Sequence, residues 1–270
     1  MSDIDKVKQL RQSTGAGFKD CNLALKESSG DIDKAIEILR IKGISKASKK
    51  MSRDAKEGVI ATSGDVNKTS VIEINCETDF VAKNESYLNL ANALVDKALN
   101  HESLESFLKS DFSGMTVSEK LIEQTGLIGE KIEIGGFKTL QASFVGYYIH
   151  AGNKIAALTG LSLAIDNAAE ISKNVAMQAA AMNPIALNEE GVDSSIIEKE
   201  IEIAKDQLRQ EGKPEAMLDN IAKGKIKRFF KDNTLVNQDY IKDGKQSVKQ
   251  YVSSFDQNLK VTGFSRLSLV

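Results

Sequence analysis

Cysteine and histidine are scarce in this chain of 270 residues, which contains two of each. Cys21 and Cys76 cannot provide the disulfide framework of a small secreted protein, and they form no Cys-x-x-Cys motif. His101 and His150 form no His-x-x-x-His motif, and no Gly-x-Ser-x-Gly sequence occurs. The sequence therefore gives no strong signal for an enzyme active site, a metal site or a bound cofactor.

Long hydrophobic runs and an excess of one charge are absent as well. The longest apolar-looking run, residues 155–165, contains Thr159, Gly160 and Ser162, and it is far shorter than the roughly 20 residues that span a bilayer. The charged first ten residues are not followed by the apolar segment of a secretory signal. The net charge of -2 gives no general attraction to nucleic acid or to membranes. We therefore expect a cytoplasmic protein.

The hydrophobic content of 41% is sufficient for a real core, and the chain length suggests one to three domains. Residues 1–54 are predicted to form a domain of three short helices and a linker. The turn Thr14-Gly15-Ala16-Gly17 ends the first helix, Asp31 is a good N-cap for the third, and Gly43 is expected to close it. Because a unit of this length buries little apolar surface, we expect it to pack one face against another part of the chain or another protein.

The segment 45–57 is rich in basic residues but has no apolar face. Its basic residues are Lys46, Lys49, Lys50, Arg53 and Lys56. We interpret it as a linker or a frayed helix, and a solvated segment is favoured because no aromatic residue is interleaved for base stacking. An RNA-binding segment is the alternative, and it predicts a steeply salt-dependent affinity for RNA.

Residues 55–140 are predicted to form a first α/β subdomain. Strands at 59–61 and 71–76 are joined by a turn at 64–67, and an amphipathic helix follows with apolar residues spaced by three and four between Tyr87 and Ala98. Cys76 is in phase with the buried face of its strand, which favours an inert buried thiol. A catalytic pair of Cys76 and His150 is the alternative, and it predicts a depressed thiol pKa and rapid alkylation.

Residues 141–182 and 231–270 are predicted to form a second α/β subdomain. Strand patterns cover 140–149 and 155–164 around a Gly152-Asn153 turn, and a helix and a late strand near 261–269 follow. The two subdomains repeat one order, paired strands and then a helix, although their residues show no strong identity.

Residues 183–230 are predicted to form an antiparallel helical hairpin. Two narrow apolar stripes with spacings of three and four are separated by Gly212-Lys213-Pro214. Because each stripe is narrow, we expect the hairpin to project from the body of the protein.

The segment 75–84, NCETDFVAKN, lies between a strand and the next helix. Phe80 and Val81 are apolar residues with polar neighbours. Spacing alone favours Phe80 as a core residue, because most phenylalanines are buried. The alternative is an aromatic anchor on a loop tip, inserted into a partner's pocket.

Two long motifs, in this order, decide between these interpretations. Residues 7–25, VKQLRQSTGAGFKDCNLAL, and residues 74–83, INCETDFVAK, resemble the two signatures of the elongation factor Ts family, and shorter stretches at 30–36, 128–130, 148–150 and 261–264 match in the same order. The resemblance covers essentially the whole chain. It implies an α+β fold with a three-helix UBA-like amino-terminal domain, two related α/β core subdomains and an inserted antiparallel helical hairpin.

The resemblance also implies a function without covalent chemistry. Family members are guanine-nucleotide exchange factors that bind elongation factor Tu, both GDP-bound and nucleotide-free, and promote GDP release in translation elongation by disturbing its Mg²⁺ and nucleotide site. No cofactor and no metal of its own are implied. We do not expect direct contacts with nucleic acid or membranes, and a homodimer through the hairpin is possible.

The resemblance assigns roles to eight residues. Four of them would form the loop that disturbs the partner's magnesium site, and the other four would make further partner contacts. The loop residues are Thr78, Asp79, Phe80 and Val81; Leu10 would contact the GTPase domain, and Ile128, Gly129 and His150 would face the third domain of the partner.

Overall fold

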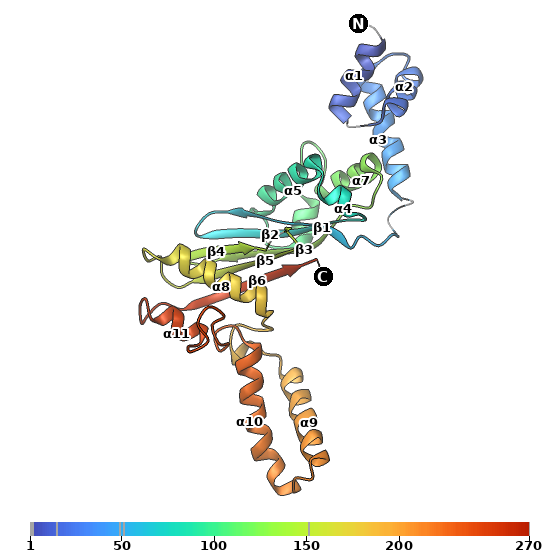
Figure 1. Ribbon diagram of the computed structural model, residues 1–270. Coiled ribbons are helices and arrows are strands. Elements are labelled where there is room, and N and C mark those ends of the chain that lie inside the picture. Colours follow the sequence, from blue (N-terminus) through green and yellow to red (C-terminus); the bar gives the residue numbers. More distant parts are fainter. Residues whose placement is uncertain (1–2, 15, 49, 51, 151, 270) are drawn as a thin grey trace.

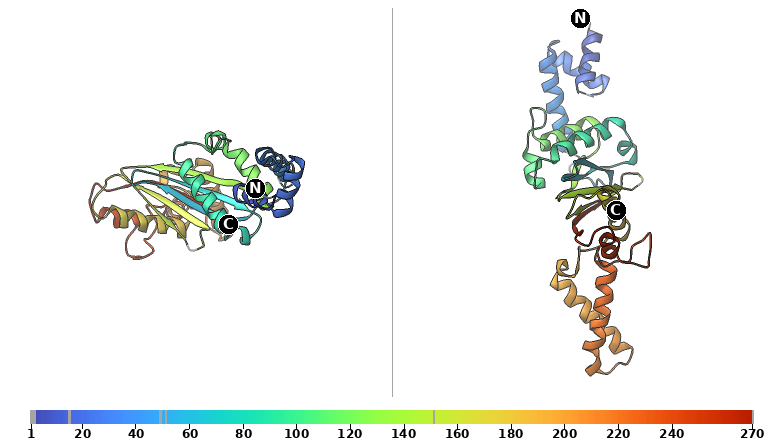
Figure 2. Two further views of the ribbon diagram at one scale, coloured as in Figure 1. Left: turned by 90° about the horizontal axis from the view of Figure 1, so that it is seen from above. Right: turned by 90° about the vertical axis from the view of Figure 1, so that its left-hand side faces the viewer.

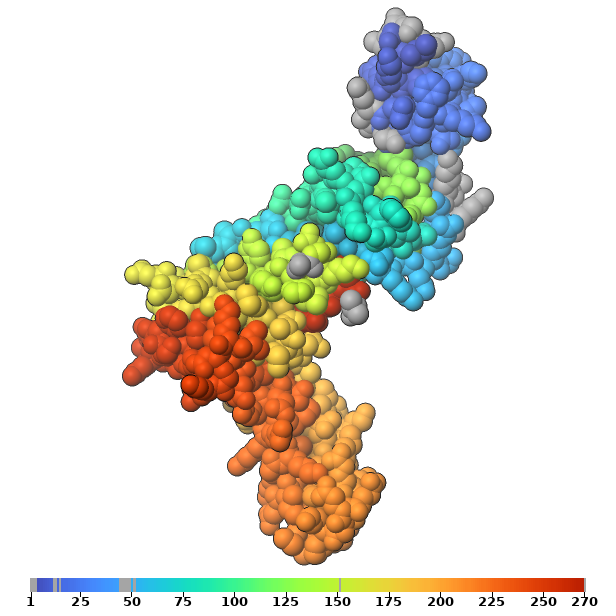
Figure 3. All heavy atoms as spheres, in the orientation of Figure 1, coloured from blue at the N-terminus to red at the C-terminus, as the bar shows by residue number. Residues whose placement is uncertain are grey.

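The computed structural model describes residues 3–14, 16–48, 50, 52–150 and 152–269, and it shows an elongated mixed α+β molecule (Figure 1). Two sheets occupy the middle, and helices extend from them at both ends, as the right-hand view of Figure 2 also shows. In the space-filling view the first helices form a lobe at one end, and the helices near residue 210 form the opposite end (Figure 3). Among the residues described, no helix is long and apolar enough to cross a membrane.

Three helices, α1 (Asp3–Thr14), α2 (Phe18–Glu27) and α3 (Ile32–Ser48), form the N-terminal unit. Their buried side chains form a small core of their own: Val7, Leu10, Ala16, Cys21, Ala24, Leu25, Ala35 and Leu39. The predicted N-cap is confirmed, because Asp31 Oδ1 accepts a hydrogen bond from the Lys34 N–H at 3.1 Å. Gly15 and Lys49 lie outside the described residues.

The prediction that Gly43 closes the third helix is wrong, since α3 continues to Ser48. Gly43 instead lies where α3 crosses α7 (Val117–Ile128). A Cβ atom on Gly126 of α7 would lie 2.4 Å from the Gly43 carbonyl oxygen, so the two backbones touch. Glycine serves here for close approach of two helices and not for a helix end.

The first sheet contains β1 (Glu57–Gly64), β2 (Lys68–Cys76) and β3 (Glu133–Gln141), all antiparallel and in the order β1-β2-β3. Its outer face is covered by α5 (Glu85–Ala98), with α6 (Leu104–Lys109) and α7 nearby. Ile72, Ile74 and Cys76 share this buried face, as the alternating pattern predicts.

The second sheet contains β4 (Phe144–Ile149), β5 (Ile155–Leu161) and β6 (Val261–Ser268) in the order β4-β5-β6. The helices α8 (Ala168–Met182) and α11 (Val248–Ser253) cover its outer face. The strand predicted to start at residue 140 is wrong in part, because Leu140 still belongs to β3, opposite Thr69, and the chain turns after Gln141 and before Phe144. That turn contains neither glycine nor proline, so the sequence gives no sign of it.

The two sheets pack face to face. Ile60 and Val71 of the first sheet meet Ala156 and Leu158 of the second in a shared cluster. The middle of the molecule therefore has four layers, with helices on each outer face and two sheets between them.

The helices α9 (Ser194–Gln210) and α10 (Glu215–Asn233) lie side by side beyond the second sheet (Figure 1). Their seam is narrow, with four buried residues: Ala204, Leu208, Leu218 and Ala222. Ion pairs flank it, with Lys205 Nζ 3.0 Å from an Asp219 oxygen and Arg209 Nε 2.8 Å from a Glu215 oxygen. A 3₁₀ turn at Glu189–Gly191 precedes this pair of helices.

Candidate functional site

Residues 77–83, called the Phe80 loop below, connect the end of β2 with α5 and contain the short helix α4 (Asp79–Ala82). Thr78 caps α4, because its Oγ1 accepts a hydrogen bond from the Val81 N–H at 3.5 Å. Val81 packs against the core of the first sheet, whereas the Phe80 side chain is 83% exposed. The loop therefore holds one apolar side chain inside and presents the next one to solvent.

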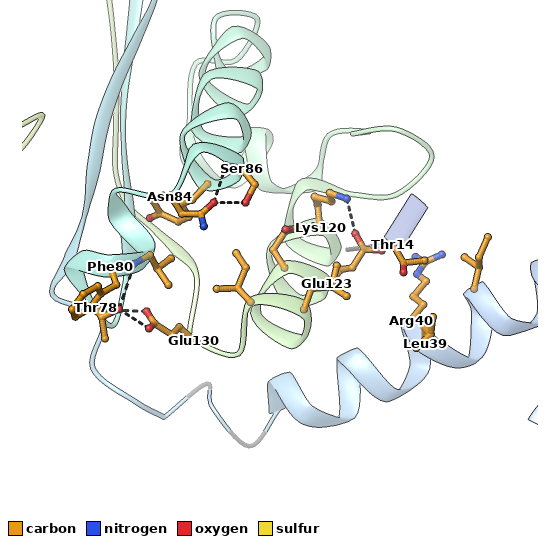
Figure 4. A pocket seen from close by; sticks show the side chains of 16 residues that line it. Thr14, Leu39, Arg40, Thr78, Phe80, Asn84, Ser86, Lys120, Glu123 and Glu130 are labelled. Atoms are coloured by element: carbon orange, nitrogen blue, oxygen red, sulfur yellow. Dashed lines mark hydrogen bonds and ion pairs between the residues drawn. The ribbon is translucent and has the colours of Figure 1, made fainter. Parts of the chain in front are cut away.

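The Phe80 loop is fastened to the turn between α7 and β3 by a carboxylate. Glu130 Oε2 accepts hydrogen bonds from the N–H groups of Glu77 and Thr78, at 3.0 and 2.9 Å. Glu130 Oε1 accepts from the Thr78 hydroxyl at 2.6 Å (Figure 4). Hydrogen bonds to an ionised acceptor are stronger than neutral ones, so this contact fixes the loop backbone.

A second carboxylate makes the return contact. Glu77 Oε1 accepts a hydrogen bond from the Lys131 N–H at 2.7 Å, and Arg53 lies 3.2 Å from Glu77 Oε2. The hydrogen bond from Lys131, together with Arg53, lowers the pKa of Glu77 below its usual value, although partial desolvation opposes the shift. Each of the two segments thus supplies a carboxylate to the backbone of the other.

The turn that carries Glu130 is itself well determined. Gly129 ends α7 in the left-handed conformation, with φ of 91°, and its carbonyl accepts a hydrogen bond from the Lys50 ammonium group. The buried Thr125 hydroxyl accepts from the Ile132 N–H at 2.9 Å. These contacts fix the path of the chain after α7, and this path places Glu130 beside the Phe80 loop.

Asp79 lies beside Phe80 with its carboxylate paired. Lys83 Nζ is 2.7 Å from Asp79 Oδ2, and this hydrogen bond lowers the pKa of Asp79. Lys154, near the turn between β4 and β5, lowers this pKa further and also pairs with Glu57 at 2.8 Å. The carboxylate next to Phe80 in the sequence is therefore already paired within the chain.

A groove of about 820 Å³ lies between the N-terminal unit and the first sheet's helices (Figure 4). Thr14, Leu39 and Arg40 line it from the N-terminal unit, and Phe80 borders it on the opposite side. Lys120 and Glu123 of α7, 2.6 Å apart, lie between them. The groove thus joins two parts of the chain that are distant in sequence.

The structure brings together most, but not all, of the predicted site residues. Thr78, Phe80, Val81 and Ile128 line the groove, and Gly129 lies next to Ile128. His150 does not line the groove; it follows β4, with its Nδ1 3.1 Å from the Tyr148 hydroxyl. The resemblance groups Ile128 with His150, whereas the structure places Ile128 beside the Phe80 loop.

Leu10 lies in the N-terminal unit, away from the Phe80 loop. Its side chain is fully buried in the core of the N-terminal unit. The partner contact predicted for Leu10 stays a prediction, and in this structure Leu10 holds the three helices together.

Glu130 is the site residue that sequence reasoning missed. Nothing in its local pattern separates it from an ordinary surface glutamate. The one available signal is Gly129, because a glycine that ends a helix places the next residue in the turn.

The contacts of Cys76 disfavour the alternative of a cysteine enzyme. Its side chain is fully buried, its Sγ donates to the Thr78 carbonyl at 3.2 Å, and burial raises the pKa of the thiol. A nucleophilic cysteine requires the opposite shift. Among the described residues, no group of three or more histidine, cysteine, aspartate or glutamate side chains could hold a metal ion.

The basic segment is largely engaged within the chain, which disfavours the RNA-binding alternative. Lys50 bonds the Gly129 carbonyl, Arg53 pairs with Glu77, and Lys56 lies 3.4 Å from Asp54. Lys49 and the side chain of Lys46 lie outside the described part of the structure.

Comparisons with known proteins agree with the resemblance. The family model described as elongation factor TS matches residues 77–269. Elongation factor Ts of Christiangramia forsetii is 60% identical over 266 residues, which cover 98% of this chain and 97% of that protein. The protein of the same name from Flavobacterium psychrophilum is 59% identical, covering 97% of both chains, and that from Hydrogenobaculum sp. is 43% identical, covering 98% and 97%.

Proposed function

The chain belongs to the elongation factor Ts family, and we propose that it uses the exposed Phe80 to release GDP from elongation factor Tu. Members of this family are nucleotide exchange factors in translation elongation, not enzymes, and they act in the bacterial cytoplasm. The proposal assigns the exchange step to the Phe80 loop of this chain.

The observation that carries the proposal is the exposure of Phe80 on a fastened loop. A phenylalanine that is 83% exposed leaves most of its ring in water, at a cost that burial in a partner would remove. Because Glu130 holds the backbone beside it, the ring is presented without the entropy loss of ordering a loose loop. Rigid aromatic anchors of this kind dominate many protein interfaces.

Thermodynamic linkage explains how such an anchor releases a nucleotide. A factor that binds nucleotide-free elongation factor Tu more tightly than the GDP-bound form must weaken GDP binding by the same ratio. Insertion of Phe80 near the nucleotide favours a conformation with poor magnesium coordination. Because Mg²⁺ requires nearly ideal octahedral geometry, a small displacement of its ligands costs much GDP affinity.

The groove suggests how the partner docks. It is bordered by Phe80 on one side and by Leu39 and Arg40 on the other, so one element of the GTPase domain can meet both the N-terminal unit and the Phe80 loop. Thr78 and Val81 position the loop, and Asp79 adds charge next to the ring. Contacts of Ile128, Gly129 and His150 with the third domain belong to the same proposal.

The finer division of the fold is also a proposal. We assign residues 1–54 to a UBA-like domain with its linker, residues 55–140 to one core subdomain, and residues 141–182 with 231–270 to a second, related one. The hairpin insertion is assigned to residues 183–230. The separate core of the N-terminal unit and the equal strand orders of the two sheets support these boundaries.

A homodimer through the α9–α10 hairpin stays a prediction. Its outer surface has partly exposed apolar side chains, Ile196, Ile203 and Met217, which a second copy could cover. Sedimentation equilibrium would decide: a dimer that becomes monomeric in an Ile203→Glu variant supports the prediction, and a monomeric wild type rejects it.

Release of a fluorescent GDP from purified elongation factor Tu tests the proposed function. We expect the wild-type chain to accelerate release strongly and the Phe80→Ala variant to lose most of the acceleration. Since Phe80 is exposed, the variant should unfold at the wild-type temperature. A variant as active as the wild type would remove Phe80 from the mechanism.

A further inference from the structure

We propose that Glu130 is the positioning residue for nucleotide exchange: its carboxylate fixes the backbone of Glu77 and Thr78 and thereby the direction in which Phe80 projects. This inference rests on the proposed function, because it concerns the residue that makes Phe80 effective. Glu130 itself would act through the loop and not through contact with the nucleotide.

The Phe80 loop needs support from outside because α4 is too short to support itself. It has four residues, and the first turn of a helix is unfavourable because several backbone angles are fixed for a single hydrogen bond. The Thr78 cap provides one local contact, but its hydrogen bond to the Val81 N–H is long, at 3.5 Å. The three hydrogen bonds to Glu130 are all shorter, between 2.6 and 3.0 Å.

The donors that meet Glu130 favour a charged acceptor at this position. Both of its oxygens accept, one from two successive N–H groups and the other from a hydroxyl. In Glu130→Gln the amide oxygen can face the two N–H groups while the NH₂ group donates to the Thr78 hydroxyl, so the variant keeps the volume of the side chain but replaces charge-assisted hydrogen bonds by weaker neutral ones. The nearby Glu133 provides a matched control, because its carboxylate pairs with the Lys131 side chain, at 2.9 Å, and not with the Phe80 loop.

The position of Glu130 also explains why the role falls to this residue. Gly129 turns the chain out of α7, and Lys131 donates its N–H to Glu77. The two carboxylates therefore connect the loop and the turn in both directions, and either one alone would leave the loop free to pivot. Phe80 is two residues beyond Thr78, so a pivot there would move the ring away from the groove.

The experiment measures GDP release from elongation factor Tu at saturating concentrations of the factor. We expect Glu130→Gln and Glu130→Ala to lower the saturating release rate by about ten-fold, the size expected when a hydrogen bond to a charged group is lost. Glu133→Gln should leave it unchanged. In a Phe80→Ala background, Glu130→Gln should cause little further loss, because both changes remove the same contact.

Amide hydrogen exchange provides a readout that does not need the partner. The amides of Glu77 and Thr78 should exchange about ten-fold faster in Glu130→Gln than in the wild type or in Glu133→Gln. Equal protection in all three proteins would overturn the proposal. So would a saturating release rate that is unchanged in Glu130→Gln, or losses in Glu130→Gln and Phe80→Ala that multiply.

A failure of the proposed function would look different. In that case the Phe80→Ala variant would accelerate GDP release from elongation factor Tu as much as the wild type does. The amide exchange of Glu77 and Thr78 would then alone decide whether Glu130 orders the loop. Should Glu130→Ala fold poorly, Glu130→Gln keeps the volume of the side chain and answers the same question.

Discussion

The two sheets of the molecule have the same layout but different connections. In each sheet an antiparallel strand pair leads into the helix that covers its outer face, α5 in the first and α8 in the second. The first connection contains α4 and presents Phe80, which is 83% exposed. The second connection, residues 162–167, presents no aromatic side chain, and its Leu163 is only 36% exposed.

The difference shows which parts of the fold are constrained by packing. The strands and covering helices bury apolar faces in both sheets, so packing in the core limits which residues they can contain. A connection on the surface is free of that requirement and can carry a contact residue. In this protein the first connection carries the exposed Phe80 and is fastened by Glu130, whereas the second carries no exposed aromatic residue.

The largest expected effects concern the cores, where the two halves should behave alike. Leu94 in α5 and Ile171 in α8 are both fully buried. We expect Leu94→Ala and Ile171→Ala each to cost about 2–5 kcal/mol in the free energy of unfolding, through lost burial and the cavity left behind. Urea denaturation would measure both. A cost below that range in only one half would show that the two cores differ in kind.

Two helix glycines should give opposite results. A Cβ on Gly126 would lie 2.4 Å from the Gly43 carbonyl oxygen, whereas a Cβ on Gly224 in α10 would meet nothing within 4 Å. We expect Gly126→Ala to cost about 1–3 kcal/mol because α3 and α7 must separate. Gly224→Ala should stabilise the protein by up to about 1 kcal/mol, because alanine favours the helix. Thermal unfolding of both variants would show whether the signs differ.

Acid should weaken the first connection by a small amount. The pKa of Glu77 is lowered from its usual 4.5, so the ionised form is favoured in the folded state. The resulting stabilisation is complete above that value and is lost as the pH falls through the lower, folded pKa. We expect at most about 1 kcal/mol, because the carboxylate lies near solvent.

The comparison of the wild type with Glu77→Gln tests this expectation. Urea denaturation at neutral pH should show the wild type to be more stable, and the difference should shrink in acid. A difference that stays constant with pH would mean that the charge of Glu77 does not contribute.

Periodicity in the sequence predicts the elements whose pattern is purely local. The helix over Tyr87–Ala98 corresponds to α5, and the turn at 64–67 and the Asp31 cap occur as predicted. Predictions are wrong where a contact with a distant part of the chain determines the role of a residue. Gly43 has the usual signature of a helix end, but its partner Gly126 lies far along the chain. No local pattern contains that information.

The site was predictable only in part, for the same reason. Spacing alone favours a buried Phe80, and only the family signature points to the exposed position that the structure shows. The resemblance assigns Leu10 to a partner contact, which stays a prediction, whereas the structure shows Leu10 buried in the core of the N-terminal unit. The role of Glu130 depends on donors 52 and 53 residues away, and the turn signal of the neighbouring Gly129 does not identify those donors.

The most direct test of the account is the ratio of two dissociation constants, for nucleotide-free and for GDP-bound elongation factor Tu. Calorimetry with the wild type, Phe80→Ala and the matched Leu163→Ala variant would provide it. Linkage predicts that the wild type and Leu163→Ala prefer the nucleotide-free form by the same large factor, and that Phe80→Ala loses most of this preference. A Phe80→Ala variant that keeps the full ratio would contradict the assignment of exchange to the first connection.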